Sequence, residues 1–411
     1  MRALSFATVF AALSGFIVLW IAQWPLDTET ELRYFQAYWG LFFASTGLVD
    51  GITQETTRAV AGSRESNQRR NANPWKLGGA VAAIVAGVAL ALGFLLMAQV
   101  VPTSPQFASL LLAFGLMSYV FQAVLSGILS GAQLWNQYAG LVALDSGIRL
   151  ALVIVAWYLG WGLEAFLLIT VIGALSWIAI LGLSPTARTS IRTALDVNQG
   201  AFARRVVSAM LASGSTAALI TGYPTFLNAA FPHEDPTTLV TIAGIANAVT
   251  LTRAPILVPL QRFQSALVVR FVESKDHIYI AVARPVAAVL GIGALGFVAA
   301  WLLGPWILRI AFKEELFVPG LILGLLTFAS ALAGSLMVTG TAVLALEQHT
   351  WYVAGWILAS VVAYSTLFLS SLGLVPAVCT SLIVGPLAGA VVHLVALGRA
   401  RVAPHTTYAQ G

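Results

Sequence analysis

The chain has 411 residues, of which 59% are hydrophobic and 9% charged, with a formal net charge of +5 at pH 7 and a mean hydropathy of +0.88. Water-soluble domains do not reach this hydropathy, so the composition excludes a soluble enzyme and indicates an integral membrane protein. The apolar runs are about 20 residues long, as membrane-spanning helices require, whereas barrel strands would alternate over about 10 residues. We therefore expect an all-α polytopic membrane protein.

Twelve apolar runs follow one another along the chain, each bounded by charges or by Pro and Gly. The first is too long for a signal-peptide core and is followed directly by a second, so we interpret it as a retained helix. The seventh contains Gly214, Gly222 and Pro224, which would permit a bend or close packing. The predicted membrane helices span 3–24, 34–58, 77–100, 107–130, 138–159, 163–183, 206–229, 237–262, 279–303, 317–342, 351–372 and 374–397.

Basic residues between these spans predict the topology. One set of connections carries most of the cations, whereas the opposite set is richer in Asp and Glu. The positive-inside rule therefore places both termini in the cytoplasm. The basic stretch "AGSRESNQRRNANPWK" is explained by topology, but docking of anionic lipid or a diphosphate headgroup is a second interpretation. The cations on the predicted inner side are Arg2, Arg58, Arg64, Arg69, Arg70, Lys76, Arg188, Arg192, Arg204, Arg205, Arg270, Lys275, Arg399 and Arg401.

The longest interior loop, 184–205, divides the twelve spans into six and six. The passages "GAQLWNQY" and "LALEQHTWY" lie at corresponding places in the two halves, each a short turn with an interfacial Trp and Tyr. We therefore predict an N-terminal lobe, 1–205, and a C-terminal lobe, 206–411, around a central cavity. The chain has no phosphate-binding loop motif, its five histidines show no ligand spacing, and Cys379 is its only cysteine. No cofactor, metal site or catalytic residue is therefore expected.

Several charged residues fall inside the predicted spans. A charge at the bilayer centre costs about 2.5–3.5 kcal/mol on insertion scales, so such residues should face a polar cavity or a partner. We take the arginines as candidates for substrate binding, and the acids as candidates for ion coupling or charge balancing. The arginines are Arg58, Arg149, Arg253, Arg262 and Arg284, and the acids are Asp50, Glu55 and Asp145.

Arg253 is the most deeply placed of these arginines, about 22 Å from the outer end of its helix. Pro255 and Pro259 follow it and favour a bend, which suggests a hinge beside an anion site. Pairing of Arg253 with a buried carboxylate is the alternative. Arg58 and Arg284 lie close enough to a helix end to extend their side chains to water.

Two other groups are defined by helical spacing. Asp145 and Arg149 are four residues apart and therefore predict an ion pair on one helix face, with substrate binding or proton coupling as the alternative. In "GLVDGITQETTR", Asp50, Thr53 and Gln54 form a polar stripe that Thr57 continues.

The order of these features resembles the MOP (MATE/oligosaccharidyl-lipid/polysaccharide) exporter superfamily, and within it the Wzx-like polysaccharide flippases. The resemblance rests on "YFQAYWGLFFASTGLVDGITQETTRAV", on "LSGILSGAQLWNQYAGLVALDSGIRLALVIVAWYLGWGLEAFL", and on "LLGPWILRIAFKEELFVPGLILGLL". Arg58, Arg149 and Arg253 match positions where that family tends to hold Arg. The chain departs from the related lipid II flippases, because it has no charge in its first helix beyond Arg2 and lacks two further helices.

The resemblance implies a flippase, not an enzyme, in the bacterial inner membrane. It would move a polyprenyl-linked sugar by alternating access, as a monomer, beside glycosyltransferases or a polymerase of the same pathway. Coupling to H⁺ or Na⁺ is an open alternative, and nucleic acid is not an expected partner. Two other functions stay open: a multidrug exporter of the same superfamily, and a polyprenyl-phosphate glycosyltransferase using the acids of "PLDTETELRY", Asp27, Glu29 and Glu31.

Overall fold

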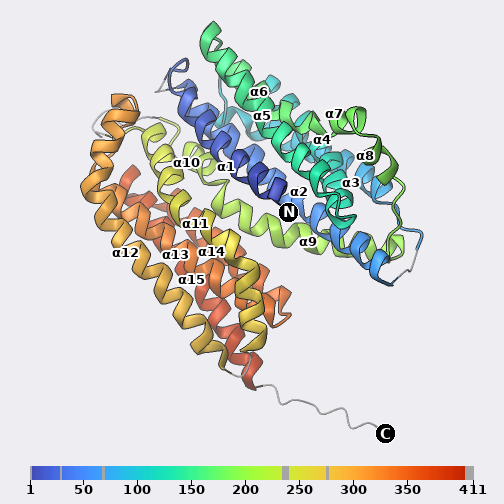
Figure 1. Cartoon of the computed structure of the whole chain (residues 1–411). Coiled ribbons are helices and arrows are strands. Elements are labelled where there is room, and N and C mark those ends of the chain that lie inside the picture. Colours follow the sequence, from blue (N-terminus) through green and yellow to red (C-terminus); the bar gives the residue numbers. More distant parts are fainter. Residues whose placement is uncertain (1, 28–29, 67–69, 234–239, 275–276, 403–411) are drawn as a thin grey trace. The chain divides into compact units, whose positions relative to one another are not determined.

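The computed structural model describes residues 2–27, 30–66, 70–233, 240–274 and 277–402. Within these residues the regular structure is helical, apart from an isolated antiparallel bridge between Arg70 and Leu195. The chain divides into two compact units, Met1–Glu234 and Asp235–Gly411 (Figure 1). The boundary predicted between residues 205 and 206 falls inside a helix that packs within the first unit, so the observed division comes later in the chain.

The first unit contains ten α-helices among its described residues, together with short 3-10 turns at Met97–Gln99 and Gly173–Leu175. They are α1 (Arg2–Ala22), α2 (Glu31–Ser66), α3 (Pro74–Leu96), α4 (Pro105–Gly131), α5 (Trp135–Leu159), α6 (Leu163–Ile172), α7 (Ser176–Leu183), α8 (Pro185–Ser190), α9 (Gln199–Ile220) and α10 (Tyr223–Ala230).

The second unit contains five long helices among its described residues, and a 3-10 turn at Glu314–Leu316. They are α11 (Ile242–Glu273), α12 (Ile278–Ala311), α13 (Gly320–Ala345), α14 (His349–Leu369) and α15 (Leu374–Val402).

The predicted all-α membrane architecture is confirmed. Ten helical stretches in the described residues are long and apolar enough to cross a membrane, or up to 11 if the bent pair α9 and α10 forms one span. The helix α2, which contains the predicted span 34–58, is not among these stretches, because charged and other polar residues at its start and from Asp50 onward lower its hydropathy. The span predicted at 206–229 is broken after Ile220, where α9 and α10 meet at 54°. Gly222 and Pro224 lie at this break, and Gly214 instead packs against Leu48.

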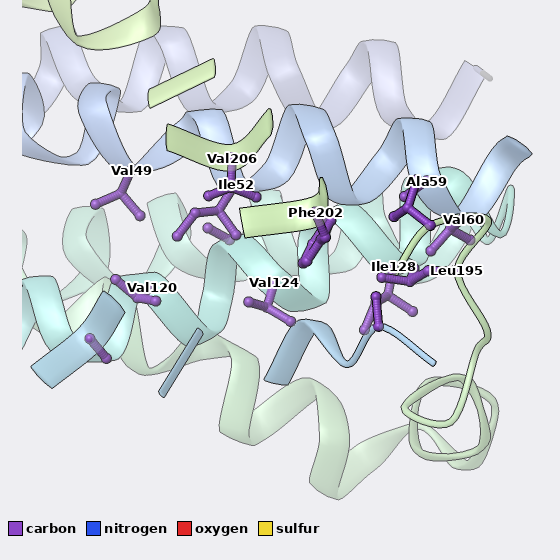
Figure 2. Packing of buried hydrophobic residues seen from close by; sticks show 14 residues of the cluster. Val49, Ile52, Ala59, Val60, Val120, Val124, Ile128, Leu195, Phe202 and Val206 are labelled. Atoms are coloured by element: carbon purple, nitrogen blue, oxygen red, sulfur yellow. The ribbon is translucent and has the colours of Figure 1, made fainter. Parts of the chain in front are cut away.

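One helix forms the centre of each unit. In the first, α4 packs against α2, α3 and α6, and in the second α13 packs against α11, α12 and α15. Figure 2 shows the core of the first unit, where Val120 and Val124 of α4 gather with Val49 and Ile52 of α2, and Ile128 of α4 lies beside Val60 at the other end of the cluster. The same cluster includes Leu195, Phe202 and Val206, so the segment after α8 is part of this core.

Each unit has the same type of turn at the end of its central helix. Gln133 follows α4 and Glu347 follows α13, and both adopt positive φ angles, 59° and 62°. In each case the next residue, Leu134 or Gln348, donates its N–H to a carbonyl five residues earlier, which is the helix-ending arrangement that usually places glycine at the left-handed position. These turns lie in the two passages whose similarity indicated an internal repeat.

The helices α2 and α9 approach closely through small residues. A Cβ atom added at Gly51 would overlap the backbone of Ala209 and Met210, and one at Gly47 would overlap Ala217. The small residues of α2 therefore allow α9 to pack with its backbone almost in contact, as small residues do between membrane helices.

Candidate functional site

The first unit holds a polar cluster between α2, α4 and α5, which we call the α4 polar cluster: Asp50, Tyr119, Gln122, Asp145 and Arg149. Asp50 lies on α2, and its Oδ1 atom accepts a 2.8 Å hydrogen bond from the hydroxyl of Tyr119. One turn further along α4, the amide of Gln122 donates to Oδ1 of Asp145 at 3.3 Å. Neighbouring residues of α4 thus hold the two carboxylates that come from α2 and α5.

Arg149 forms the innermost part of this cluster and is 3% exposed. Its Nη1 atom lies 2.6 Å from Oδ2 of Asp145, so the predicted pairing of these two residues is present. Its Nε donates to the carbonyl of Thr170 at 2.8 Å, and the guanidinium lies over the rings of Phe42 and Phe43. The buried Nη2 atom has no hydrogen-bond partner among the described residues.

The glycine at position 173 makes room for this guanidinium, because a Cβ there would overlap the Cζ of Arg149. Beyond Gln122, the cluster continues through hydrogen bonds to the start of α7. Ser176 donates to the Gln122 Oε1 at 3.1 Å, and Trp177 donates to the Ser118 hydroxyl at 3.0 Å. The guanidinium is therefore surrounded by residues of α2, α5, α6 and the turn Gly173–Leu175, and its Nη2 has no hydrogen-bond partner among the described residues, an arrangement able to bind an anion or a carbonyl oxygen.

Sequence reasoning identified Asp50, Asp145 and Arg149 but missed Tyr119 and Gln122. The signal was present, since both interrupt the apolar run of α4 at a spacing of three residues. Neither carries a formal charge, and for that reason neither was expected to be costly in a membrane.

Arg58 and Glu55 form a second group at the end of α2. Arg58 donates to both carboxylate oxygens of Glu55 and also to Asp196, which precedes α9. Arg205 of α9 lies 3.9 Å from Glu55. Glu55 therefore balances two cations, and the Arg58 charge, with 43% of the side chain exposed, is met by two carboxylates.

The other three candidate arginines lie in the second unit. Arg253 is buried within α11, and Pro255 and Pro259 lie inside that helix, which continues to Glu273. Arg284 is exposed near the start of α12. The side chain of Arg262 lies outside the described part of the structure.

The second unit also buries His393 between α13 and α14. Its ring nitrogens lie 3.1 Å from the hydroxyl of Thr339 and 3.1 Å from the carbonyl of Tyr352. No group of three or more His, Cys, Asp or Glu side chains in the described residues could hold a metal ion.

Curated relatives cover almost the whole chain. Two Mycobacterium tuberculosis proteins, "Uncharacterized protein Rv3630" and "Uncharacterized protein Rv1510", are each 33% identical to it over 96% of this chain and 90% of the relative. The Mycobacterium bovis "Uncharacterized protein Mb3654" is 34% identical over the same shares. No family model matches the chain.

Solved transporter structures share the fold. A multidrug resistance MATE family transporter of the MOP superfamily, in an inward-facing conformation, gives a TM-score of 0.74 at 15% identity, over 97% of this chain and 96% of that one. A MOP superfamily transporter from Pyrococcus furiosus, described as having a binding pocket of reverse polarity that suggests a different function, gives 0.65 at 14% identity, over 98% and 96%. The resemblance to the MOP superfamily is confirmed at the level of the fold.

Proposed function

We propose that this chain, which belongs to the family of the mycobacterial proteins Rv3630 and Rv1510 and has the fold of MOP superfamily transporters, is a flippase for a polyprenyl-linked saccharide. It would translocate the sugar and its phosphate or diphosphate headgroup across the cytoplasmic membrane for envelope polysaccharide assembly. The observation that carries this proposal is the burial of arginines within a multi-pass transporter fold. Glycosyltransferases or a polymerase of the same pathway would supply and consume the glycolipid.

The buried arginines support an anionic substrate. Arg149 keeps one guanidinium nitrogen without a hydrogen-bond partner in the described residues, and Arg253 is buried in α11. Guanidinium groups bind phosphate with paired, charge-assisted hydrogen bonds, and they would offset the loss of hydration of the headgroup. The Pyrococcus furiosus transporter supports the idea that this fold accommodates pockets of differing polarity.

The carboxylates supply a means of ion coupling. Asp145 is neutralised by Arg149, whereas the oxygen of Asp50 accepts its hydrogen bond from an uncharged phenol. A carboxylate in this position is suited to bind and release H⁺ or Na⁺ during transport. Membrane potential acting on the headgroup, or consumption of the product outside, is the alternative driving force.

Export of cationic drugs is the second candidate, because the same Asp50 carboxylate would attract a cation. A glycosyltransferase has less support. Asp27, one of the acids that would be needed, accepts hydrogen bonds from the N–H and hydroxyl of Thr30, and Glu31 accepts one from the N–H of Asp27. These two carboxylates are engaged in the turn that leads into α2, and Glu29 lies outside the described residues.

Reconstituted protein tests the proposal. Proteoliposomes loaded from one side with a fluorescent polyprenyl-diphosphate sugar should show transfer to the other leaflet, and Arg253→Ala should abolish it. Arg253→Lys retains the charge and should retain part of the transfer. Unimpaired transfer in Arg253→Ala would exclude Arg253 as a substrate-binding residue. Efflux of a cationic dye without glycolipid transfer would favour the multidrug alternative.

A further inference from the structure

We propose that the basic end of the first unit is a binding platform for anionic phospholipid headgroups, separate from the transport site. The platform consists of Arg70, Lys76, Arg188, Arg192 and Arg204. All five side chains are exposed. They come from three parts of the chain: the bridge before α3 and the start of α3, α8 and the turn after it, and α9.

Specific contacts bring these three parts together. Arg70 donates its backbone N–H to the carbonyl of Leu195 at 2.8 Å, and the N–H of Asn73 donates to the side chain of Gln199 at 2.8 Å. The start of α3 is thereby tied to the segment that leads into α9. Leu195 lies in the same core cluster as Phe202 of α9, and Figure 2 shows both beside Ile128 of α4.

The helix α8 is attached to the same surface. Ala187 of α8 is fully buried in a cluster with Leu125 and Leu129 of α4, and Trp75 of α3 packs against that cluster. Arg188 and Lys76 are the chain neighbours of Ala187 and Trp75. The cations Arg188 and Lys76 are therefore adjacent in the chain to residues that pack against the same hydrophobic cluster of α4.

Carboxylates do not neutralise this surface. Residues 59–76 and 183–206 contain two acids, Glu65 and Asp196. Asp196 is occupied by Arg58, and no ion pair to any of the five platform cations is present in the described part of the chain. Among the described residues of these two segments, the five exposed cations are therefore accompanied by Glu65, which is exposed and forms no ion pair with a described residue.

The position of the platform favours lipid over a soluble anion. The apolar helix α7 leads into α8 through Ser184, and Leu183, at the junction, is 79% exposed. An exposed Leu directly before a basic helical turn is typical of a segment at the boundary between acyl chains and headgroups. Basic residues at that depth are attracted to anionic lipids of the inner leaflet.

The test compares lipid binding by the full-length protein and by variants with altered platform charge. Protein in a neutral detergent is titrated with phosphatidylglycerol or phosphatidylcholine, and bound lipid is counted by native mass spectrometry. The triple variant Arg188→Gln/Arg192→Gln/Arg204→Gln should bind phosphatidylglycerol roughly 10- to 100-fold more weakly at low ionic strength, because each basic residue contributes a few-fold. Binding of phosphatidylcholine should not change.

Two controls decide the cause. Arg188→Lys/Arg192→Lys/Arg204→Lys retains the charge and should bind phosphatidylglycerol as the unaltered protein does. Arg309→Gln/Lys313→Gln removes two cations of the second unit and should have no effect. Equal phosphatidylglycerol affinity in the Gln triple variant and the unaltered protein would overturn the proposal, as would displacement of the lipid by equimolar inorganic pyrophosphate, which would indicate a free diphosphate site.

Discussion

The hydroxyl of Tyr119 on α4 donates a 2.8 Å hydrogen bond to the Oδ1 of Asp50 on α2. This contact joins the charged second half of α2 to α4, the central helix of the first unit. Removing the donor would leave a carboxylate oxygen without its partner, at a cost of about 1–3 kcal/mol.

Tyr119→Phe should therefore lower the free energy of unfolding by about 1–3 kcal/mol, measured by denaturant unfolding in detergent. Tyr158→Phe is the matched control, because Tyr158 is 89% exposed on α5. That control should change stability by less than about 0.5 kcal/mol. Equal effects of the two substitutions would show that the hydrogen bond to Asp50 contributes nothing.

The pair of Asp145 and Arg149 should be strongly coupled in a double-mutant cycle. Arg149→Gln leaves the Asp145 carboxylate without its 2.6 Å partner and should lower stability by about 3–5 kcal/mol. Adding Asp145→Asn should recover part of that loss, because neither charge then needs a counter-ion. Additive losses in thermal unfolding would indicate that the two side chains act independently.

Replacing the left-handed residues that follow α4 and α13 with glycine should raise the stability of the protein. Gln133→Gly and Glu347→Gly should each raise the free energy of unfolding by about 1 kcal/mol, because glycine adopts a positive φ without steric cost. Gly160 has a φ of 67°, so Gly160→Ala should lower stability by a similar amount. A loss in both Gln133→Gly and Glu347→Gly would contradict the assigned backbone conformation.

Because α2 and α9 pack closely, the stability of the protein should depend sharply on side-chain size at their contact. Gly51→Ala places a methyl group against the backbone of α9 and should lower stability by about 1–3 kcal/mol. Gly79→Ala is the control, since nothing lies within 4 Å of a Cβ there. Its stability should stay unchanged or rise by up to about 1 kcal/mol, and a similar loss in both variants would exclude the packing explanation.

The ion pairs of Arg58 should hold the segment before α9 in place. Arg58→Gln removes the charge partner of Asp196, and trypsin should then cleave after Arg192 several-fold faster in limited proteolysis. The global stability should fall by no more than about 1 kcal/mol, because the side chain is partly exposed. Arg270→Gln, at the exposed end of α11, should leave cleavage after Arg192 unaltered.

The approximate positions of most membrane helices followed from the sequence because such a helix is specified locally, by about 20 apolar residues. The sequence predicted twelve spans, whereas ten or up to 11 helical stretches of the described residues are long and apolar enough. The contact between Asp145 and Arg149 was equally accessible, since a spacing of four residues places both on one helix face. The break at Gly222 was also indicated, by glycine and proline in one apolar run.

What only the tertiary structure decided is which polar groups meet across helices. The partner of Asp50 is Tyr119, and the partner of Arg58 includes Asp196, which lies 138 positions away in the chain. Apolar patterning does not distinguish the faces of a helix that is hydrophobic all round, so the sequence could not predict which side of α4 would meet α2. The charged residues that need a polar partner inside the membrane could be recognised from the sequence, whereas the identity of each partner depends on how whole helices pack.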